Sequence, residues 1–225
     1  MRDAVAAVLR KELALEIRAP QSVTAMALFS LTTFVVFHFA LQRGEVAGDL
    51  AAGVLWITLL LAALLGISRL FVADHEEGGL DGFLLAPVDR SALLVAKATA
   101  LLAFLAVLEI VAVPAFAVLL LGPSPGPATY LRLIAVIALA DVGVAVIGTL
   151  VGALAVQTRA RDLLVPLLAL PLLIPVVIAA AKATTPLLLQ AGAAPLPGRW
   201  LAILGLYDLV FGLLAYAVFD FLVED

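Results

Sequence analysis

The sequence predicts an all-α integral membrane protein with six transmembrane helices and an N-terminal amphipathic helix at the membrane interface. The first observation is composition: of 225 residues, 65% are hydrophobic and 13% are charged. A soluble domain is about 45–50% apolar and about 25% charged, so this chain lacks the polar surface to cover one. The second is a series of apolar stretches near the length of about 20 residues that a spanning helix needs. The third is that Gly, Pro or charged residues separate most of them.

Six stretches are long enough to span a bilayer. They are residues 22–41, 50–67, 92–121, 130–156, 163–181 and 200–221, so the chain 1–225 is expected to form a single membrane domain. The third and fourth exceed a perpendicular crossing, which predicts tilt or a break, and Pro114 is the expected break in the third. The fifth contains Pro166, Pro171 and Pro175. Each proline removes a backbone donor, so a bend is expected there.

The distribution of Lys and Arg near the spans predicts the orientation, because these residues are enriched on the cytoplasmic side. With the N-terminus inside, the inner side carries Arg2, Arg10, Lys11, Arg18, Arg69, Arg90, Lys97, Arg159 and Arg161. The outer side carries Arg43, Arg132, Lys182 and Arg199. Both termini are therefore expected in the cytoplasm, with the spans in a bacterial inner membrane.

Residues 1–20 are charged and amphipathic, which is typical of a helix that lies at the interface. Basic side chains share one face at about 100° per residue, and apolar side chains occupy the other arc. Glu12 and Glu16 interrupt that apolar arc. Two interpretations stay open: a loosely amphipathic surface helix, or a helix in which Glu12 meets a partner inside the assembly.

The loop 68–90 is the longest one expected on the cytoplasmic side. It places four acids beside a Gly-Gly pair, followed by Leu80, Phe83 and Leu84 at the i, i+3, i+4 spacing of a short apolar helix face that ends before Pro87. Such a face packs either on lipid headgroups or on a soluble protein. Its position in the sequence does not choose between them.

Other motifs argue against several classes of function. The chain has no cysteine, no phosphate-binding P-loop and a net charge of −4 without a basic stripe, which argues against thiol chemistry, direct ATP binding and nucleic acid as a partner. His75 starts a sequence similar to a zinc-protease helix, but Gly79 stands where the second His is needed. No catalytic residue and no metal site are predicted.

A few residues inside the spans are candidates for function. Glu109, Asp141 and Asp208 are ionisable groups in apolar stretches, so they face a cavity or a partner, or else they are hydrogen-bonded at helix contacts. His38 near the outer end of the first span either ligates a metal or haem or is a lone interfacial histidine. Gly148 and Gly152 favour a close helix pair, within one subunit or between two.

Several blocks of sequence resemble one known family. They are GVLWITLLLAALLGISRLF at 53–71, DHEEGGLDGFLLAP at 74–87, LLVAKA at 93–98, LPLLIP at 170–175 and LAILG at 201–205. Together they resemble the haem exporter protein B (CcmB) family, the membrane subunit of the cytochrome c maturation ABC system, over a little more than a third of the chain. The resemblance applies to Arg69, Leu70, Phe71, Asp74, Glu77, Gly78, Leu80, Asp81, Pro87, Lys97, Pro171 and Pro175.

The resemblance implies an ABC-2-type exporter fold and a permease subunit that binds no cofactor directly. A separate ATPase subunit (CcmA) would use ATP, with CcmC and CcmD as further partners, the haem chaperone CcmE as an indirect one, and two copies of this chain per complex. Haem would be the cargo, either exported itself or released on its chaperone. The implied ATPase-coupling loop comprises Asp74, Glu77, Gly78, Leu80, Asp81, Phe83, Leu84 and Pro87.

A rival interpretation from the residues alone is a stand-alone proton-coupled secondary transporter. Glu109, Asp141 and Asp208 would carry its protons. An intramembrane enzyme is a third class, but the sequence shows no paired nucleophile and base for it.

Overall fold

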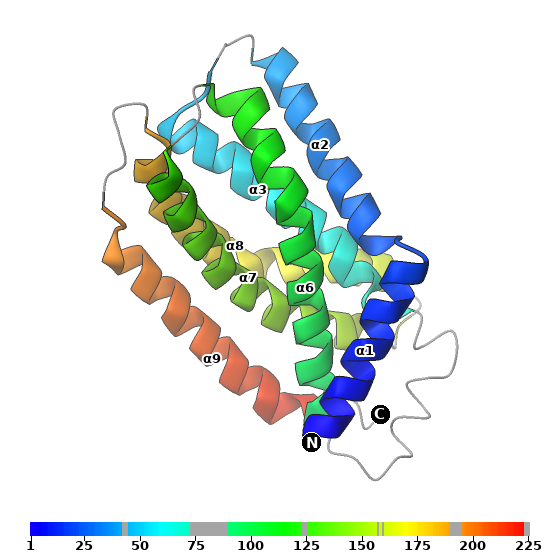
Figure 1. Ribbon diagram of the computed structural model, residues 1–225. Helices are drawn as coiled ribbons and strands as arrows, with labels where there is room; N and C mark the ends of the chain where they lie inside the picture. The colour runs from blue at the N-terminus through cyan, green and yellow to red at the C-terminus, as the bar shows by residue number, and fades with distance from the viewer. Residues whose placement is uncertain are drawn as a thin grey trace.

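A computed structural model describes residues 1–41, 45–72, 90–122, 126–156, 158, 160–189 and 195–222 (Figure 1). This part of the chain is almost entirely helical and contains no strand. Its α-helices are α1 (Arg2–Arg18), α2 (Ser22–Ala40), α3 (Gly48–Arg69), α6 (Ser91–Phe116), α7 (Pro127–Val156), α8 (Arg161–Thr184) and α9 (Gly198–Leu222). A π-helical turn, η1 (Ala117–Leu121), extends α6, and a 3₁₀ turn, η2 (Thr185–Leu188), extends α8.

Six of these helices are long and apolar enough to cross a membrane: α2, α3, α6 with η1, α7, α8 with η2, and α9. The predicted fold class is therefore confirmed, including the separate amphipathic helix α1. Helices α3 and α7 are the most buried spans, whereas α2 and α9 lie on opposite flanks of the bundle (Figure 1). Helix α1 crosses the lower end and packs on α6.

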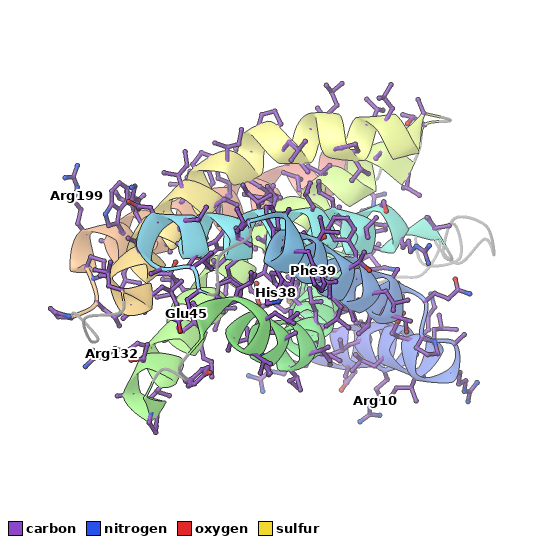
Figure 2. The ribbon with its side chains drawn as sticks, turned by 90° about the horizontal axis from the view of Figure 1, so that it is seen from above. Arg10, His38, Phe39, Glu45, Arg132 and Arg199 are labelled. Carbon is purple, nitrogen blue, oxygen red and sulfur yellow. The ribbon has the colours of Figure 1, made fainter. Side chains whose placement is uncertain are left out.

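The bundle has two ends that differ in what they hold together. The start of α1, the end of α3, the start of α6 and the end of α9 lie at one end, which we call the α1 end (Figure 1). The opposite end, formed by 45–49, 117–122 and 182–188, is called the far end. Figure 2 shows Glu45, Arg132 and Arg199 at the far end and Arg10 at the α1 end.

Small residues on α7 allow its close contact with α3. A Cβ atom added to Gly148 would lie 2.7 Å from Cγ1 of Ile67, and one added to Gly152 would lie 3.1 Å from Cδ2 of Phe71. Only hydrogen fits at the first position without a shift of the neighbour. The Gly148/Gly152 pair thus forms a helix contact within this subunit, which is one of the two alternatives that the sequence left open.

At the far end, α2 is joined to η1. The Nδ1 atom of His38 lies 2.6 Å from the carbonyl oxygen of Leu119, and the Val46 N–H donates to the Leu120 carbonyl at 2.8 Å. Pro114 lies inside α6, which continues to Phe116 before the wider π-helical turn begins. The Nδ1 atom of His38 therefore has a structural role, because its contact connects α2 to η1.

The same end joins α3 to α8. The Trp56 Nε1–H donates to Oγ1 of Thr184 at 3.0 Å in a buried position, and the exposed Lys182 lies 3.1 Å from Asp49. Thr185 also donates to Asp49, at 3.0 Å.

Helix α8 keeps all three of its prolines inside one continuous helix. Because proline has no N–H, each leaves a carbonyl one turn earlier without its helical partner. Pro175 leaves the carbonyl of Pro171 without its helical donor, and the next carbonyl, that of Leu172, accepts a hydrogen bond from the Tyr207 hydroxyl at 2.8 Å. This contact fixes α9 against the proline-rich segment of α8.

Candidate functional site

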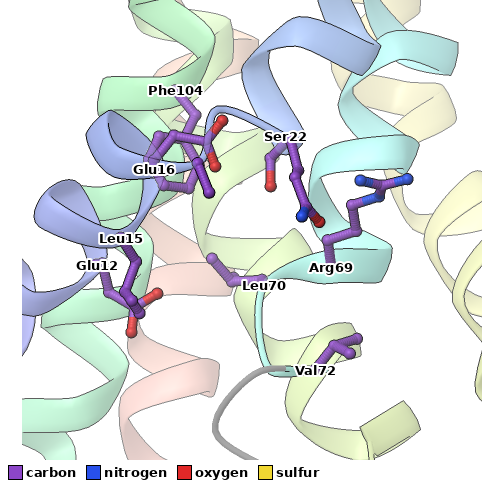
Figure 3. A pocket seen from close by; sticks show the side chains of 10 residues that line it. Glu12, Leu15, Glu16, Ser22, Arg69, Leu70, Val72 and Phe104 are labelled. Carbon is purple, nitrogen blue, oxygen red and sulfur yellow. The ribbon is translucent and has the colours of Figure 1, made fainter.

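A cavity of about 470 Å³ opens at the α1 end, between α1, the start of α2, the end of α3 and α6 (Figure 3). Its walls combine charged and apolar side chains: Glu12, Leu15, Glu16, Ala19, Gln21, Ser22, Arg69, Leu70, Val72 and Phe104. Figure 3 shows Glu12 and Glu16 on the α1 side and Arg69 on the α3 side. The cavity is therefore a recess of mixed polarity, and its wall includes Leu70 and Val72, which come just before the undescribed residues 73–89.

Lys97 is the centre of a buried cluster next to this cavity. Its side chain is 1% exposed, and its Nζ lies 3.0 Å from Oε1 of Glu12. The same Nζ donates to the Leu70 carbonyl at 2.6 Å and lies 4.9 Å from the ring centroid of Phe71. One ammonium group thus joins α1, the end of α3 and α6; Lys97, Glu12, Leu70 and Phe71 are called the Lys97 cluster below.

The local sequence explains why the cluster forms. Lys97 lies two turns into α6 within an apolar run, so its stem packs among apolar side chains while the ammonium group needs an acceptor. Glu12 is the buried residue of α1, on the face that packs against α6. The glutamate that interrupts the apolar arc of α1 therefore meets a lysine of the same chain.

Glu16 has a different role on the same helix. Its Oε1 accepts the backbone N–H of Val23 at 2.8 Å, in the first turn of α2. The first N–H groups of a helix have no partner within the helix, so this carboxylate caps α2 and fixes the turn between α1 and α2.

The acids inside the spans form two separate sites. Glu109 on α6 and Asp141 on α7 are hydrogen-bonded to each other through their side chains and line one small void. Asp208 on α9 instead packs against Gly143 on α7, where a Cβ atom would collide with its carboxylate. Residues 141 and 143 point to opposite sides of a helix, so α7 separates Asp208 from the other two acids.

Asp208 has an unusual environment. It is 8% exposed, and neither of its carboxylate oxygens has a hydrogen-bond partner among the described residues. Burying a polar group without a partner is unfavourable, and burying a charge without one is far more so. Asp208 is thus a candidate functional residue that the local packing does not explain.

The sequence-predicted coupling residues Asp74, Glu77, Gly78, Leu80, Asp81, Phe83, Leu84 and Pro87 lie outside the described residues. The described chain reaches Val72 before them and resumes at Arg90, and both flanks belong to the α1 end. In the described part of the chain, no group of three or more His, Asp or Glu side chains is placed to hold a metal ion.

The sequence placed Lys97 among the basic residues of the inner side but did not indicate its partner. It also did not identify Glu16 as a cap or the hydrogen bond between Trp56 and Thr184. A lysine in an apolar run of α6 and a glutamate in the apolar arc of α1 are the two signals that together point to the buried ion pair.

Six apolar helices long enough to span a bilayer and a separate amphipathic helix define a polytopic α-helical membrane protein. The profile of the family described as "CcmB protein" matches residues 3–221. The chain belongs to the CcmB family.

Relatives named "Heme exporter protein B" agree with this assignment. The protein of Rhodobacter capsulatus is 37% identical over 177 residues, which is 78% of this chain and 80% of the relative. The protein of Bradyrhizobium diazoefficiens is 32% identical over 216 residues, 95% of this chain and 96% of the relative. The Pseudomonas aeruginosa protein is 30% identical over 208 residues, 90% of this chain and 89% of the relative.

Proposed function

We propose that this chain is the membrane (permease) subunit of an ABC transporter complex for c-type cytochrome biogenesis. It couples ATP hydrolysis by a separate ATPase subunit to haem export or to the release of a haem-loaded chaperone. The observation that carries the proposal is the family match over residues 3–221, supported by haem exporter relatives that align with up to 95% of the chain.

The proposed partners are the ATPase CcmA, the membrane proteins CcmC and CcmD, and indirectly the chaperone CcmE, with two copies of this chain per complex. Residues 1–225 work as one membrane domain in the bacterial inner membrane. The α1 end faces the cytoplasm in this proposal, because Arg10, Lys11, Arg18 and Arg69 belong to it. No cofactor is bound directly: ATP acts through the partner, and haem is cargo.

The proposed mechanism uses the loop that follows α3. Its apolar face, Leu80, Phe83 and Leu84, docks on the ATPase, and closure of the ATPase dimer displaces it. The Lys97 cluster supports this proposal, because Leu70 and Phe71 directly precede the loop and contact the same ammonium group as Glu12. A displacement of the loop would therefore reach α1 and α6 together.

The coupling loop is tested by a pair of matched substitutions. At about 100° per residue, Leu84 lies on the docking face whereas Leu85 lies about 100° away from it. Burial of a leucine contributes roughly 1.5–3 kcal/mol, so Leu84→Asp is expected to weaken docking at least tenfold, while Leu85→Asp retains it. The measurement is co-purification of the ATPase with the chain from isolated membranes.

Insertion into the membrane is measured in the same preparations, because it is separate from docking. Leu84→Asp is expected to insert normally, lose the ATPase and stop cytochrome c maturation. If it co-purifies with a full complement of ATPase, the loop is not the coupling element.

Haem export and chaperone release are distinguished in proteoliposomes that contain the whole complex. ATP-dependent movement of haem across the bilayer without chaperone supports export. ATP-dependent release of haem-loaded chaperone, with no haem movement in its absence, supports the second activity.

A further inference from the structure

The contact between Glu109 and Asp141 lies in the interior of the bundle, between α6 and α7. Asp141 is buried and 6% exposed, whereas Glu109 is half-buried. The void that both acids line is otherwise walled by Trp56 and by apolar side chains: Leu59, Leu60, Ala63, Leu105, Leu108, Val144 and Val177. Apart from the two acids, its wall contains no titratable group.

The chemistry of the contact requires a proton. An ionised carboxylate only accepts hydrogen bonds, so two carboxyl groups bond to each other only when at least one of them is protonated. Two adjacent negative charges in an apolar interior are strongly unfavourable, both by burial and by mutual repulsion. The hydrogen-bonded pair is therefore a state in which Glu109 and Asp141 share a proton.

The titratable groups named above on the surrounding helices lie in other parts of the bundle. On α1, Glu12 pairs with Lys97 of α6, and Glu16 caps α2. On α2, His38 contacts the Leu119 carbonyl, and at the far end Asp49 of α3 pairs with Lys182 of α8. On α9, Tyr207 donates to the Leu172 carbonyl, and Asp208 packs against Gly143. Arg69 of α3 lines the cavity at the α1 end. None of these contacts involves the acid pair.

The volume of the void limits which ligands can bind between the two acids. Its volume is about 10 Å³. A single water molecule needs about 10–15 Å³, so the void does not admit a hydrated metal cation. A proton needs no such space. The geometry also gives no third His, Asp or Glu ligand among the described residues.

We propose that Glu109 and Asp141 form a proton-binding pair that holds one exchangeable proton inside the spanning bundle. When the proton leaves to water, both groups become carboxylates and their hydrogen bond is lost. Because α6 and α7 each contribute one acid, loss of the proton weakens the contact between these helices. This inference stands independently of the proposed role in haem export, since it concerns proton binding by the isolated chain.

Infrared difference spectroscopy tests the proposal directly, because a protonated carboxyl group has a carbonyl band that a carboxylate lacks. The full-length chain is reconstituted in lipid nanodiscs in an Asp208→Asn background, which removes the third acid inside the spans; Glu12 stays paired with Lys97. The expected result is a carbonyl band that disappears reversibly on alkalinisation. That band is expected to be lost entirely when Glu109→Gln and Asp141→Asn are added, since the amides keep a hydrogen bond but cannot ionise.

Tryptophan fluorescence tests whether the proton is lost at the Glu109/Asp141 pair. The chain has two tryptophans, Trp56 and Trp200. A Trp200→Phe variant therefore leaves only Trp56, which lines the void. Its emission should change over the same pH range as the infrared band. Adding Glu109→Gln should abolish this change, whereas adding the matched control Asp208→Asn should leave it.

Two results overturn the proposal. One is a carbonyl band that is absent at every pH, or that persists in the Glu109→Gln/Asp141→Asn protein. The other is a Trp56 titration that Glu109→Gln leaves unchanged. Wild-type-like helix content by circular dichroism is required of each variant, so that a lost signal reports the acids rather than unfolding.

Discussion

The Lys97→Met substitution is expected to destabilise the protein far more than the same substitution of an exposed lysine. The change leaves the Glu12 carboxylate, whose side chain is 10% exposed, beside only the half-exposed Lys11 at 3.4 Å. Removing one partner of a buried ion pair costs about 3–5 kcal/mol, because the other charge stays buried without compensation. The Leu70 carbonyl also loses its donor.

Lys11 remains near Glu12, so we expect the lower part of that range, about 3 kcal/mol. This corresponds to a roughly hundredfold change in the folded fraction. The assay is reversible denaturation of the purified chain in mixed micelles, followed by circular dichroism.

Two further variants test whether the loss of stability comes from the buried charge of Glu12. Lys182→Met removes the same group from an exposed pair, in which the Lys182 and Asp49 side chains are 51% and 72% exposed. Exposed ion pairs contribute little to stability because water and salt screen them, so this control should be nearly neutral. Replacing both Glu12 and Lys97 by Met removes the uncompensated charge and should recover more than half of the lost stability.

Equal effects of Lys97→Met and Lys182→Met on stability would contradict this prediction. A double Met variant no more stable than Lys97→Met would also contradict it, because the loss of stability would then come from packing rather than from charge.

Three other predictions follow from the packing and the charge distribution. Gly148→Leu should cost about 1–3 kcal/mol by overpacking the α7–α3 contact, whereas Gly53→Ala, where a Cβ meets nothing within 4 Å, should not destabilise; denaturation in micelles compares them. Asp208→Asn breaks no hydrogen bond of the described chain and removes a buried group that can carry a charge, so it should not destabilise the protein, and a loss above about 1 kcal/mol would reveal a hidden partner. Single cysteines at Ser124 and Gly79 should react with an impermeant thiol reagent from opposite sides of the membrane, and labelling of both from outside would contradict six spans.

The fold class followed from the sequence because the length of an apolar run is a local property. Six runs near the bilayer thickness give six spans whatever their arrangement, and residues 1–20 are too charged to be a seventh. The ends of the runs also contain their own Gly, Pro and charge signals. Nothing in such a pattern says which helices touch.

The sequence does not show which residues on different helices face each other. Glu109, Asp141 and Asp208 have the same signal, an acid in an apolar run, yet only the first two meet. The rotation of each helix about its axis is set by packing, such as the contact that Gly148 allows between α7 and α3. One sequence shows the period of a helix but not its orientation relative to a neighbour.

The pairing of Lys97 with Glu12 shows the same limit at longer range. Glu12 and Lys97 are 85 residues apart in the sequence, and each is a charged residue among apolar neighbours on its helix face. An isolated charge in an apolar setting indicates that a partner exists. Only the fold of α1 back onto α6 identifies it.

Helix α6 connects the two polar sites, since it carries both Lys97 and Glu109. They are 12 residues apart, or about 18 Å along the helix axis. If the ATPase moves α6 through the Lys97 cluster, the contact of Glu109 with Asp141 changes with it, and by linkage the proton biases that movement. The Glu109→Gln/Asp141→Asn protein keeps the hydrogen-bonded arrangement permanently. We therefore expect it to retain the ATPase subunit but to slow ATP-driven turnover of the complex by about 5–150-fold, the usual range of coupling between sites. Turnover equal to wild type, with the ATPase bound, would show that proton binding and the ATPase cycle are independent.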